Sequence, residues 1–200
     1  QRSMDLVPTS HGNADGKGTN GFLRDWHHSR PRGVVAKPPR RVLAELFTSL
    51  LALSAEFRYR PVVKNPNYLY WVDGRWVLSL IAPEEWSDAR REGFAGTVVL
   101  QPDMTWTITP SKHLSGDSPV ATALRQFYEE FVENLDTDRT FEEMLPFHVR
   151  ALPYYQRLYA SGLSRSLRAA VSSDDLASAS CRQWRMQIRG RDAAMLAQQA

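Results

Sequence analysis

The sequence predicts an α+β fold in which a small antiparallel β-meander of about four strands packs with several α-helices. Two observations lead to this class. Apolar residues alternate with polar ones over parts of residues 66–109, as in β-strands, whereas on either side they recur at helical spacing. At 200 residues the chain suits one core with appendages. We divide it into an extended basic N-terminal arm (1–39), an α+β core (40–160) and a C-terminal helical extension (161–200).

The arm has no apolar periodicity. Small polar residues fill positions 11–21 and prolines interrupt positions 30–39, so this segment cannot bury enough apolar surface to offset its ordering entropy. We therefore predict an arm that acquires a fixed shape only by lying across another molecule. Residues 1–40 contain seven basic and three acidic side chains, whereas the other 160 residues contain 18 and 19. The positive charge of the chain thus belongs to the arm.

Residues 40–57 are expected to form the first helix. Apolar residues between Val42 and Leu53 recur every three or four positions, which is the pattern of a helix with one face on a core. Pro38 and Pro39 suit the first turn of such a helix. A helix that packs on the core is favoured here over a cofactor site.

Residues 66–109 are expected to form the sheet as two strand pairs. Asp73-Gly74 separates the first pair, because glycine tolerates the positive φ of a tight hairpin turn. Pro102-Asp103 separates the second pair. Residues 104–109 of that pair alternate apolar residues with threonines, which predicts one apolar face and one face in contact with water.

The rest of the chain is expected to be helical. Ser118-Pro119 opens a helix that runs to about Leu135, and Thr140 with Glu143 has the spacing of a capping box. Ser161-Gly162 is expected to interrupt the helical segment. A final helix is expected from Ser173 or Asp174 to about Arg189.

The sequence contains no recognisable catalytic arrangement. Gly18 follows Lys17 where a phosphate-binding loop needs Ser or Thr, and the five histidines form no metal-binding pair one helical turn apart. Cys181, the single cysteine, has no identifiable base and is interpreted as an inert thiol. We therefore predict a protein that is not an enzyme and has no catalytic, cofactor-binding or metal-binding residues. No stretch is apolar enough to predict a membrane span.

Three groups of side chains are expected to bind a partner: basic residues and a tryptophan of the arm, tryptophans of the sheet region, and arginines that share one face of the final helix. Simpler interpretations stay open, namely core packing for the tryptophans and solvated charge for the arginines. The acidic residues between 129 and 138 are interpreted as a solvated face that meets the arm or the C-terminal arginines. The residues selected for partner binding are Arg24, Trp26, Arg30, Arg32, Trp71, Trp86, Arg182, Arg185 and Arg189.

One part of the chain carries a family resemblance. The residues Pro66-Asn67-Tyr68-x-Tyr70, Ser79-x-Ile81-x-Pro83-x-Glu85-Trp86, Phe94-x-Gly96 and Leu100-Gln101-x-Asp103-Met104-x-Trp106 lie in residues 61–109. This region resembles a small family of bacteria and eukaryotes known only as a domain of unknown function. The resemblance implies a fold element and no reaction.

These observations favour a non-catalytic accessory subunit of a large multiprotein assembly. Arginine outnumbers lysine 21 to 4 and the chain starts at Gln1, as expected of an imported mitochondrial protein whose presequence has been removed. We expect a respiratory-chain or ATP-synthase complex as host, on the matrix side or at the periphery of the inner membrane. Its partners would be other protein subunits, and anionic lipid suits the basic arm.

Other functions stay open. The main alternative is a mitoribosomal or other RNA-associated protein, although the body beyond residue 40 lacks the positive charge that nucleic-acid binding needs. An unrecognised enzyme and a peptide-binding module built on the tryptophans are further alternatives.

Overall fold

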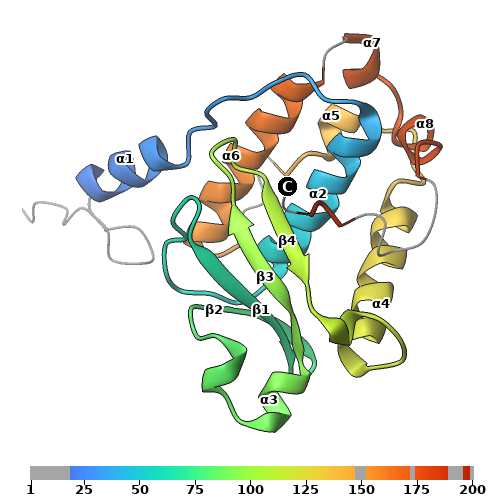
Figure 1. Cartoon of the computed structure of the whole chain (residues 1–200). Coiled ribbons are helices and arrows are strands. Elements are labelled where there is room, and N and C mark those ends of the chain that lie inside the picture. The colour runs from blue at the N-terminus through green and yellow to red at the C-terminus, as the bar shows by residue number, and fades with distance from the viewer. Residues whose placement is uncertain (1–18, 147–151, 172–173, 189–195, 199–200) are drawn as a thin grey trace, which may run out of the picture.

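A four-stranded antiparallel sheet lies against helices, which confirms the α+β class (Figure 1). The computed structural model describes residues 19–146, 152–171, 174–188 and 196–198. The strands are β1 (Pro66–Val72), β2 (Arg75–Ser79), β3 (Phe94–Leu100) and β4 (Trp106–Pro110). Between β2 and β3 lie a short 3-10 turn, Pro83–Glu85, and the helix α3 (Asp88–Glu92).

The strand order is β2-β1-β3-β4, so the expected meander is wrong in one respect. β3 pairs with β1 instead of β2. The outer edge of β2 is already occupied by the backbone of Glu56. Its amide donates to the Trp76 carbonyl (2.9 Å), and its carbonyl accepts from the amide of Leu78 (3.0 Å). β3 therefore adds to the free edge of β1. The expected hairpin at Asp73-Gly74 is present, with φ of 51° and 76° at its two residues.

The outer edge of β4 is also covered. The amide of Ile108 donates to the carbonyl of Ala197 (2.9 Å), and that of Trp106 donates to the hydroxyl of Ser49 (2.9 Å). Thr107 of β4 and Thr105 just before it are buried, so the face that was expected to contact water does so only at Thr109. Both outer strands thus have neighbours that limit edge-to-edge association.

Three long helices build the core with the sheet: α2 (Pro39–Ser54), α4 (Pro119–Asn134) and α6 (Tyr154–Ala170). Figure 1 shows α2 and α6 behind the sheet and α4 beside it. Large side chains that are almost fully buried fill the space between them, among them Phe47, Trp106 and Tyr159. Within the described residues, no helix has both the length and the apolar composition to cross a bilayer.

The expected caps and the shorter helices are present in part. The Ser118 hydroxyl accepts from the amide of Ala121 at the start of α4, and Thr140 with Glu143 forms the expected capping box of α5 (Phe141–Met144). The final helix is not continuous: it is divided into α7 (Asp174–Ala177) and α8 (Cys181–Arg185). A second capping box at Ser180 starts α8 afresh, which explains the division.

α6 runs unbroken through Ser161-Gly162, so the interruption expected there is absent, and the boundary drawn at residue 161 falls inside a helix. The glycine has a packing role instead. A Cβ atom on Gly162 would lie 2.5 Å from the carbonyl oxygen of Ser29. Gly162 therefore allows the chain after the first helix to approach the backbone of α6 closely.

The described part of the N-terminal arm is not wholly extended, and it contacts the body of the protein. Thr19–His28 forms the helix α1, and the chain that follows returns to the body of the protein. The amide of Arg32 donates to the Pro102 carbonyl (2.9 Å), and that of Lys37 donates to the Ala170 carbonyl (3.0 Å). Residues 19–39 thus contact their own chain, which the prediction of an arm lying across another molecule did not include; residues 1–18 lie outside the described part.

Candidate functional site

α1 is attached to the body through polar contacts. Asp25 is 2% exposed; it accepts a hydrogen bond from the Tyr154 hydroxyl of α6 (3.0 Å) and pairs with Arg60 (3.3 Å). Arg60 also lies 3.1 Å from Nδ1 of His28. Ser29, which follows α1, is fully buried, and its hydroxyl donates to the Trp26 carbonyl (2.8 Å). These contacts fix the rotation of α1 about its own axis.

The apolar side chains of α1 are left in contact with solvent. Phe22 is 42% exposed, Leu23 56% and Trp26 41%, and the rings of Phe22 and Trp26 stack with centroids 6.2 Å apart. A surface helix ordinarily buries its apolar residues and exposes its acids. In α1 the acid is buried and the apolar residues are exposed, an arrangement typical of a binding surface.

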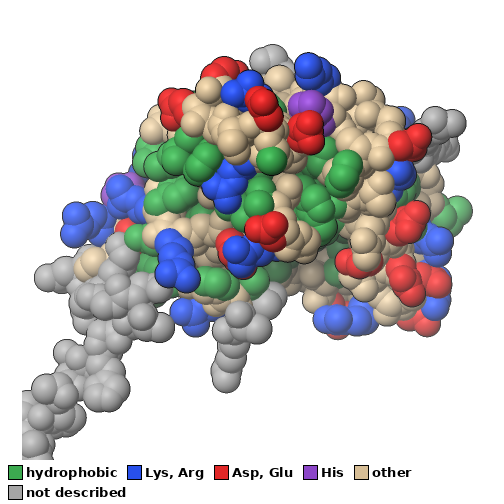
Figure 2. Space-filling view, turned by 90° about the horizontal axis from the view of Figure 1, so that it is seen from below, with side chains coloured by type: hydrophobic (Ala, Val, Ile, Leu, Met, Phe, Trp, Pro, Cys, Tyr) green, Lys and Arg blue, Asp and Glu red, His purple; other side chains and the backbone are tan. Residues whose placement is uncertain are grey.

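Cations surround this apolar face. The guanidinium of Arg165 on α6 lies 4.4 Å from the centroid of the Trp26 ring, and its buried Nη2 has no hydrogen-bond partner among the residues that the structure describes. Burial, and then the nearby charge of Arg30, lower the pKa of Arg165. Figure 2 shows basic and histidine side chains at the end of the molecule where α1 lies. We call Phe22, Leu23, Arg24, Trp26 and Arg165 the α1 surface.

Beside the α1 surface is a pocket of about 410 Å³, which we call the apolar pocket. Its floor includes Met104 and Tyr159, both 1% exposed. Its rim includes Arg30, Arg32 and Arg60, and its lining contains no acidic residue. The structure thus brings Arg30 and Arg32, two of the predicted partner-binding residues, to one cavity.

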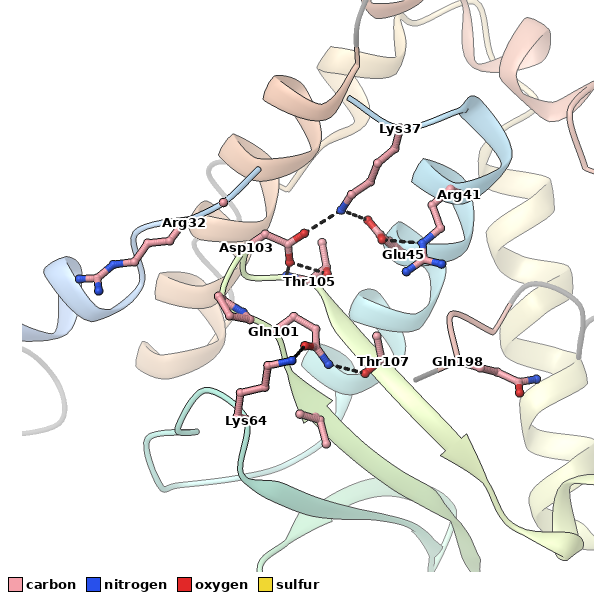
Figure 3. Close-up of a pocket in the computed structure, with 13 residues that line it drawn as sticks. Arg32, Lys37, Arg41, Glu45, Lys64, Gln101, Asp103, Thr105, Thr107 and Gln198 are labelled. Carbon is pink, nitrogen blue, oxygen red and sulfur yellow. Dashed lines mark hydrogen bonds and ion pairs between the residues drawn. The ribbon is translucent and has the colours of Figure 1, made fainter. Parts of the chain in front are cut away.

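A second cavity of about 550 Å³, the polar pocket, lies on the other side of Arg32 (Figure 3). Lys37 donates to Glu45 of α2 and to Asp103 of the β3–β4 connection, both at 2.7 Å. Arg41 donates to the other oxygen of Glu45 (2.8 Å), and the Thr105 hydroxyl donates to the other oxygen of Asp103 (2.7 Å). Every carboxylate oxygen in this group therefore has a partner.

The pKa shifts in the polar pocket argue against proton transfer near neutral pH. Burial acts to lower the pKa of Lys37, but hydrogen bonds to Asp103 and Glu45 outweigh it and raise that pKa. Burial acts to raise the pKa of Asp103, but hydrogen bonds from Lys37 and Thr105 outweigh it and lower that pKa. Both groups move away from the range in which general acids and bases work. Through these contacts Lys37 holds the segment after α1 on the body.

The two predicted tryptophans of the sheet region pack within their own chain. Trp71 is half-buried and makes an edge contact with Trp76, with ring centroids 5.0 Å apart. Trp86 is half-buried between Tyr70 and Arg90, whose guanidinium lies 4.2 Å from its ring centroid. Neither lines the apolar pocket or the polar pocket. Trp71 packs against the core, whereas Trp86 packs only with its neighbours Tyr70 and Arg90, and partner binding by either stays a prediction.

The C-terminal arginines are also engaged inside the chain. Arg182 pairs with Asp136 (2.9 Å) and Asp138, and Arg185 lies 3.7 Å from Asp136. Of the acidic residues between 129 and 138, Asp136 and Asp138 therefore meet the C-terminal arginines, as one of the sequence interpretations held. Arg189 lies outside the described residues. Figure 1 places α8 and α1 at opposite sides of the molecule, so the predicted residues do not form one site.

The other groups considered for chemistry are the cysteine and the histidines. Cys181 is buried, and burial raises its pKa, which disfavours the thiolate. His27 and His28 are exposed, and His148 lies outside the described residues. Over the part of the chain that the structure describes, no three His, Cys, Asp or Glu side chains are placed to hold a metal ion.

Comparisons with known proteins add no assignment. No family model matches this sequence, and the searches of curated proteins and of solved structures find no similar protein. The resemblance of residues 61–109 to a family of unknown function stays a prediction.

Sequence reasoning selected Arg24, Trp26, Arg30 and Arg32 but missed Arg60 and Arg165, which contact α1 from other parts of the chain. Arg60 anchors α1 from a loop 35 residues away from Asp25, and Arg165 reaches Trp26 from α6. One local signal existed: Asp25 is the only acid between residues 16 and 44, in a segment rich in basic and apolar residues. Its burial beside an arginine could not be placed without the fold.

Proposed function

We propose that this protein is a non-catalytic accessory subunit that binds another protein through the α1 surface. The observation that supports this best is the orientation of α1, in which Asp25 is buried and Phe22, Leu23 and Trp26 are exposed. Trp26 and the neighbouring arginines are of the types that dominate binding energy at interfaces, and Phe22 and Leu23 extend the exposed apolar patch around them.

The charge around α1 indicates the chemistry of the partner. Residues 19–41 contain six basic residues and one acid, Asp25, whose carboxylate is directed inward. A complementary partner would present an apolar groove bordered by Asp and Glu. An acidic protein surface suits α1 better than a bilayer, because each exposed apolar side chain keeps about half of its surface on the protein, and such a short face inserts little apolar area into lipid.

We further propose that the host assembly is the one predicted from the sequence, a mitochondrial respiratory-chain or ATP-synthase complex. The RNA-associated alternative is less favoured because the charge beyond residue 40 is slightly negative. The geometry adds no observation in favour of an enzyme, since Lys37, Glu45 and Asp103 are engaged with one another.

The test compares two exposed leucines. Leu23→Asp places a charge on the α1 surface, whereas Leu80→Asp places one at a similarly exposed site after β2; the native side chains are 56% and 60% exposed. A photo-crosslinking residue at position 23, introduced in the native host, identifies the neighbouring protein, and the purified pair is then used to measure affinity. We expect Leu23→Asp to weaken binding at least ~10-fold and Leu80→Asp to change it less than ~2-fold.

Several outcomes would contradict the proposal. Equal weakening by both substitutions would show that α1 has no special role. A complex that dissolves on nuclease treatment would indicate RNA, and flotation with phosphatidylglycerol vesicles without any crosslinked protein would indicate a lipid surface. Crosslinks from position 23 only to residues 1–18 of the same chain would show that the protein covers α1 itself.

A further inference from the structure

The apolar pocket is a second recognition feature, separate from the exposed face of α1. It lies where the end of α1 and residues 30–32 meet the loop at Pro61–Val63 and the β3–β4 connection. Its volume of about 410 Å³ is within the range of small-molecule sites. The elements around it are fixed by the contacts of Asp25 and Lys37, so the cavity is preformed.

The floor of this pocket is apolar and its polar atoms are satisfied. The Tyr159 hydroxyl donates to the carbonyl of Pro61 (2.8 Å), so this hydroxyl proton is already hydrogen-bonded within the protein. Met104 is buried beside it, and Val62 is 48% exposed, which is high for an aliphatic residue of this size. An apolar ligand would cover Val62 and remove that exposed surface from water.

The rim is cationic, and of its three arginines only Arg60 has an ion-pair partner among the described residues. The acids nearest in sequence to lining residues are Asp25, which is held by Arg60 and Tyr154, and Asp103, which is held by Lys37 and Thr105. No ion pair is found for Arg30 or Arg32 in the described part of the chain; Arg32 makes only a 3.4 Å contact with His27. Figure 3 shows the Arg32 side chain directed away from the polar pocket and toward α1.

We propose that the apolar pocket binds a small carboxylic acid with an apolar tail. The carboxylate would pair with the guanidinium groups of Arg30 and Arg32, a geometry that arginine supplies through paired N–H donors. The tail would lie over Val62, Met104 and Tyr159. A ligand with several charges is disfavoured, because the floor offers no donors to replace its water.

The test uses octanoate, with acetate and octanol as probes of the head and the tail alone. Calorimetry on the full chain measures affinity, and the methyl signal of Met104 in NMR reports the location. We expect octanoate to bind and to shift the Met104 signal, and both acetate and octanol to bind at least ~10-fold more weakly, since each lacks one half of the interaction.

Two pairs of variants complete the design. Arg32→Gln removes a rim charge, with Arg40→Gln as its exposed control; Val62→Asp charges the floor, with Val35→Asp as its control at 62% exposure. We expect Arg32→Gln to weaken octanoate binding ~3- to 10-fold and Val62→Asp to weaken it more, with both controls within ~2-fold. Thermal unfolding of each variant verifies that it is folded.

The proposal is overturned if octanol binds as tightly as octanoate, if the Met104 signal does not move, or if Arg32→Gln and Arg40→Gln have equal effects. None of these measurements involves a protein partner, and neither Arg32 nor Val62 is part of the α1 surface. The pocket and the proposed accessory function can therefore fail independently.

Discussion

Replacing Gly162 by alanine tests whether α1 is seated on the body as described. In the interior of an ordinary helix this change stabilises by about 1 kcal/mol, because alanine loses less backbone entropy than glycine. Here the new Cβ would lie 2.5 Å from the Ser29 carbonyl oxygen and 3.1 Å from Cγ of Met104. The first contact is with backbone, so relief requires the turn after α1 to move. Overpacking of this kind costs about 1–3 kcal/mol, so we expect net destabilisation of up to about 2 kcal/mol.

The measurement combines denaturant unfolding with amide hydrogen exchange. We expect Gly162→Ala to unfold at lower denaturant and to lose exchange protection over residues 25–37, while β1 and β3 keep theirs. Ser161→Ala, one position earlier in α6, is the matched control and should stabilise slightly through helix propensity. A stabilised Gly162→Ala variant with unchanged protection of residues 25–37 would refute the close approach of Ser29 to α6.

Three further predictions concern ion pairs. Lys37→Met leaves Glu45 buried with one partner fewer, and we expect a loss of about 3 kcal/mol in the free energy of unfolding, measured by urea titration. The folded-state pKa of Asp103 is lowered, so its stabilisation exists above its ordinary pKa of 3.8 and is lost as pH falls through the lower folded value; stability curves of wild type and Asp103→Asn should therefore converge in that acid range. Arg182→Gln removes solvent-exposed pairs and should leave the melting temperature unchanged within error.

Much of the fold could be predicted because local signals agreed with tertiary packing. The Asp73-Gly74 turn, the cap at Ser118 and the capping box at Thr140 each satisfy backbone groups within a few residues. The apolar repeat of α2 predicts its buried face for the same reason, since one local period decides what contacts the core. These features depend little on distant parts of the chain.

The features that were missed depend on contacts between distant residues. The backbone of Glu56 occupies the outer edge of β2, and Ser29 lies against Gly162 within the continuous helix α6. Local reasoning treated that glycine as a helix breaker, whereas its role is to permit close packing. The anchoring of α1 by Arg60 and Tyr154 joins segments 35 and 129 residues from Asp25, and periodicity carries no information about such pairs.

The polar attachment of α1 explains why its apolar side chains stay exposed. Rotating the helix to bury the exposed halves of Phe22, Leu23 and Trp26 would gain roughly 1 kcal/mol for each side chain, or about 3 kcal/mol in all. The same rotation would separate Asp25 from Tyr154 and from Arg60, whose side chain is 36% exposed, and would lose an ion pair and a hydrogen bond that together contribute about 1–3 kcal/mol. The two terms are of similar size, so rotation gains little in the free chain. A partner that covers the α1 surface buries these apolar side chains while the contacts of Asp25 with Arg60 and Tyr154 stay intact. Association is therefore the lower-energy way to remove the side chains from water.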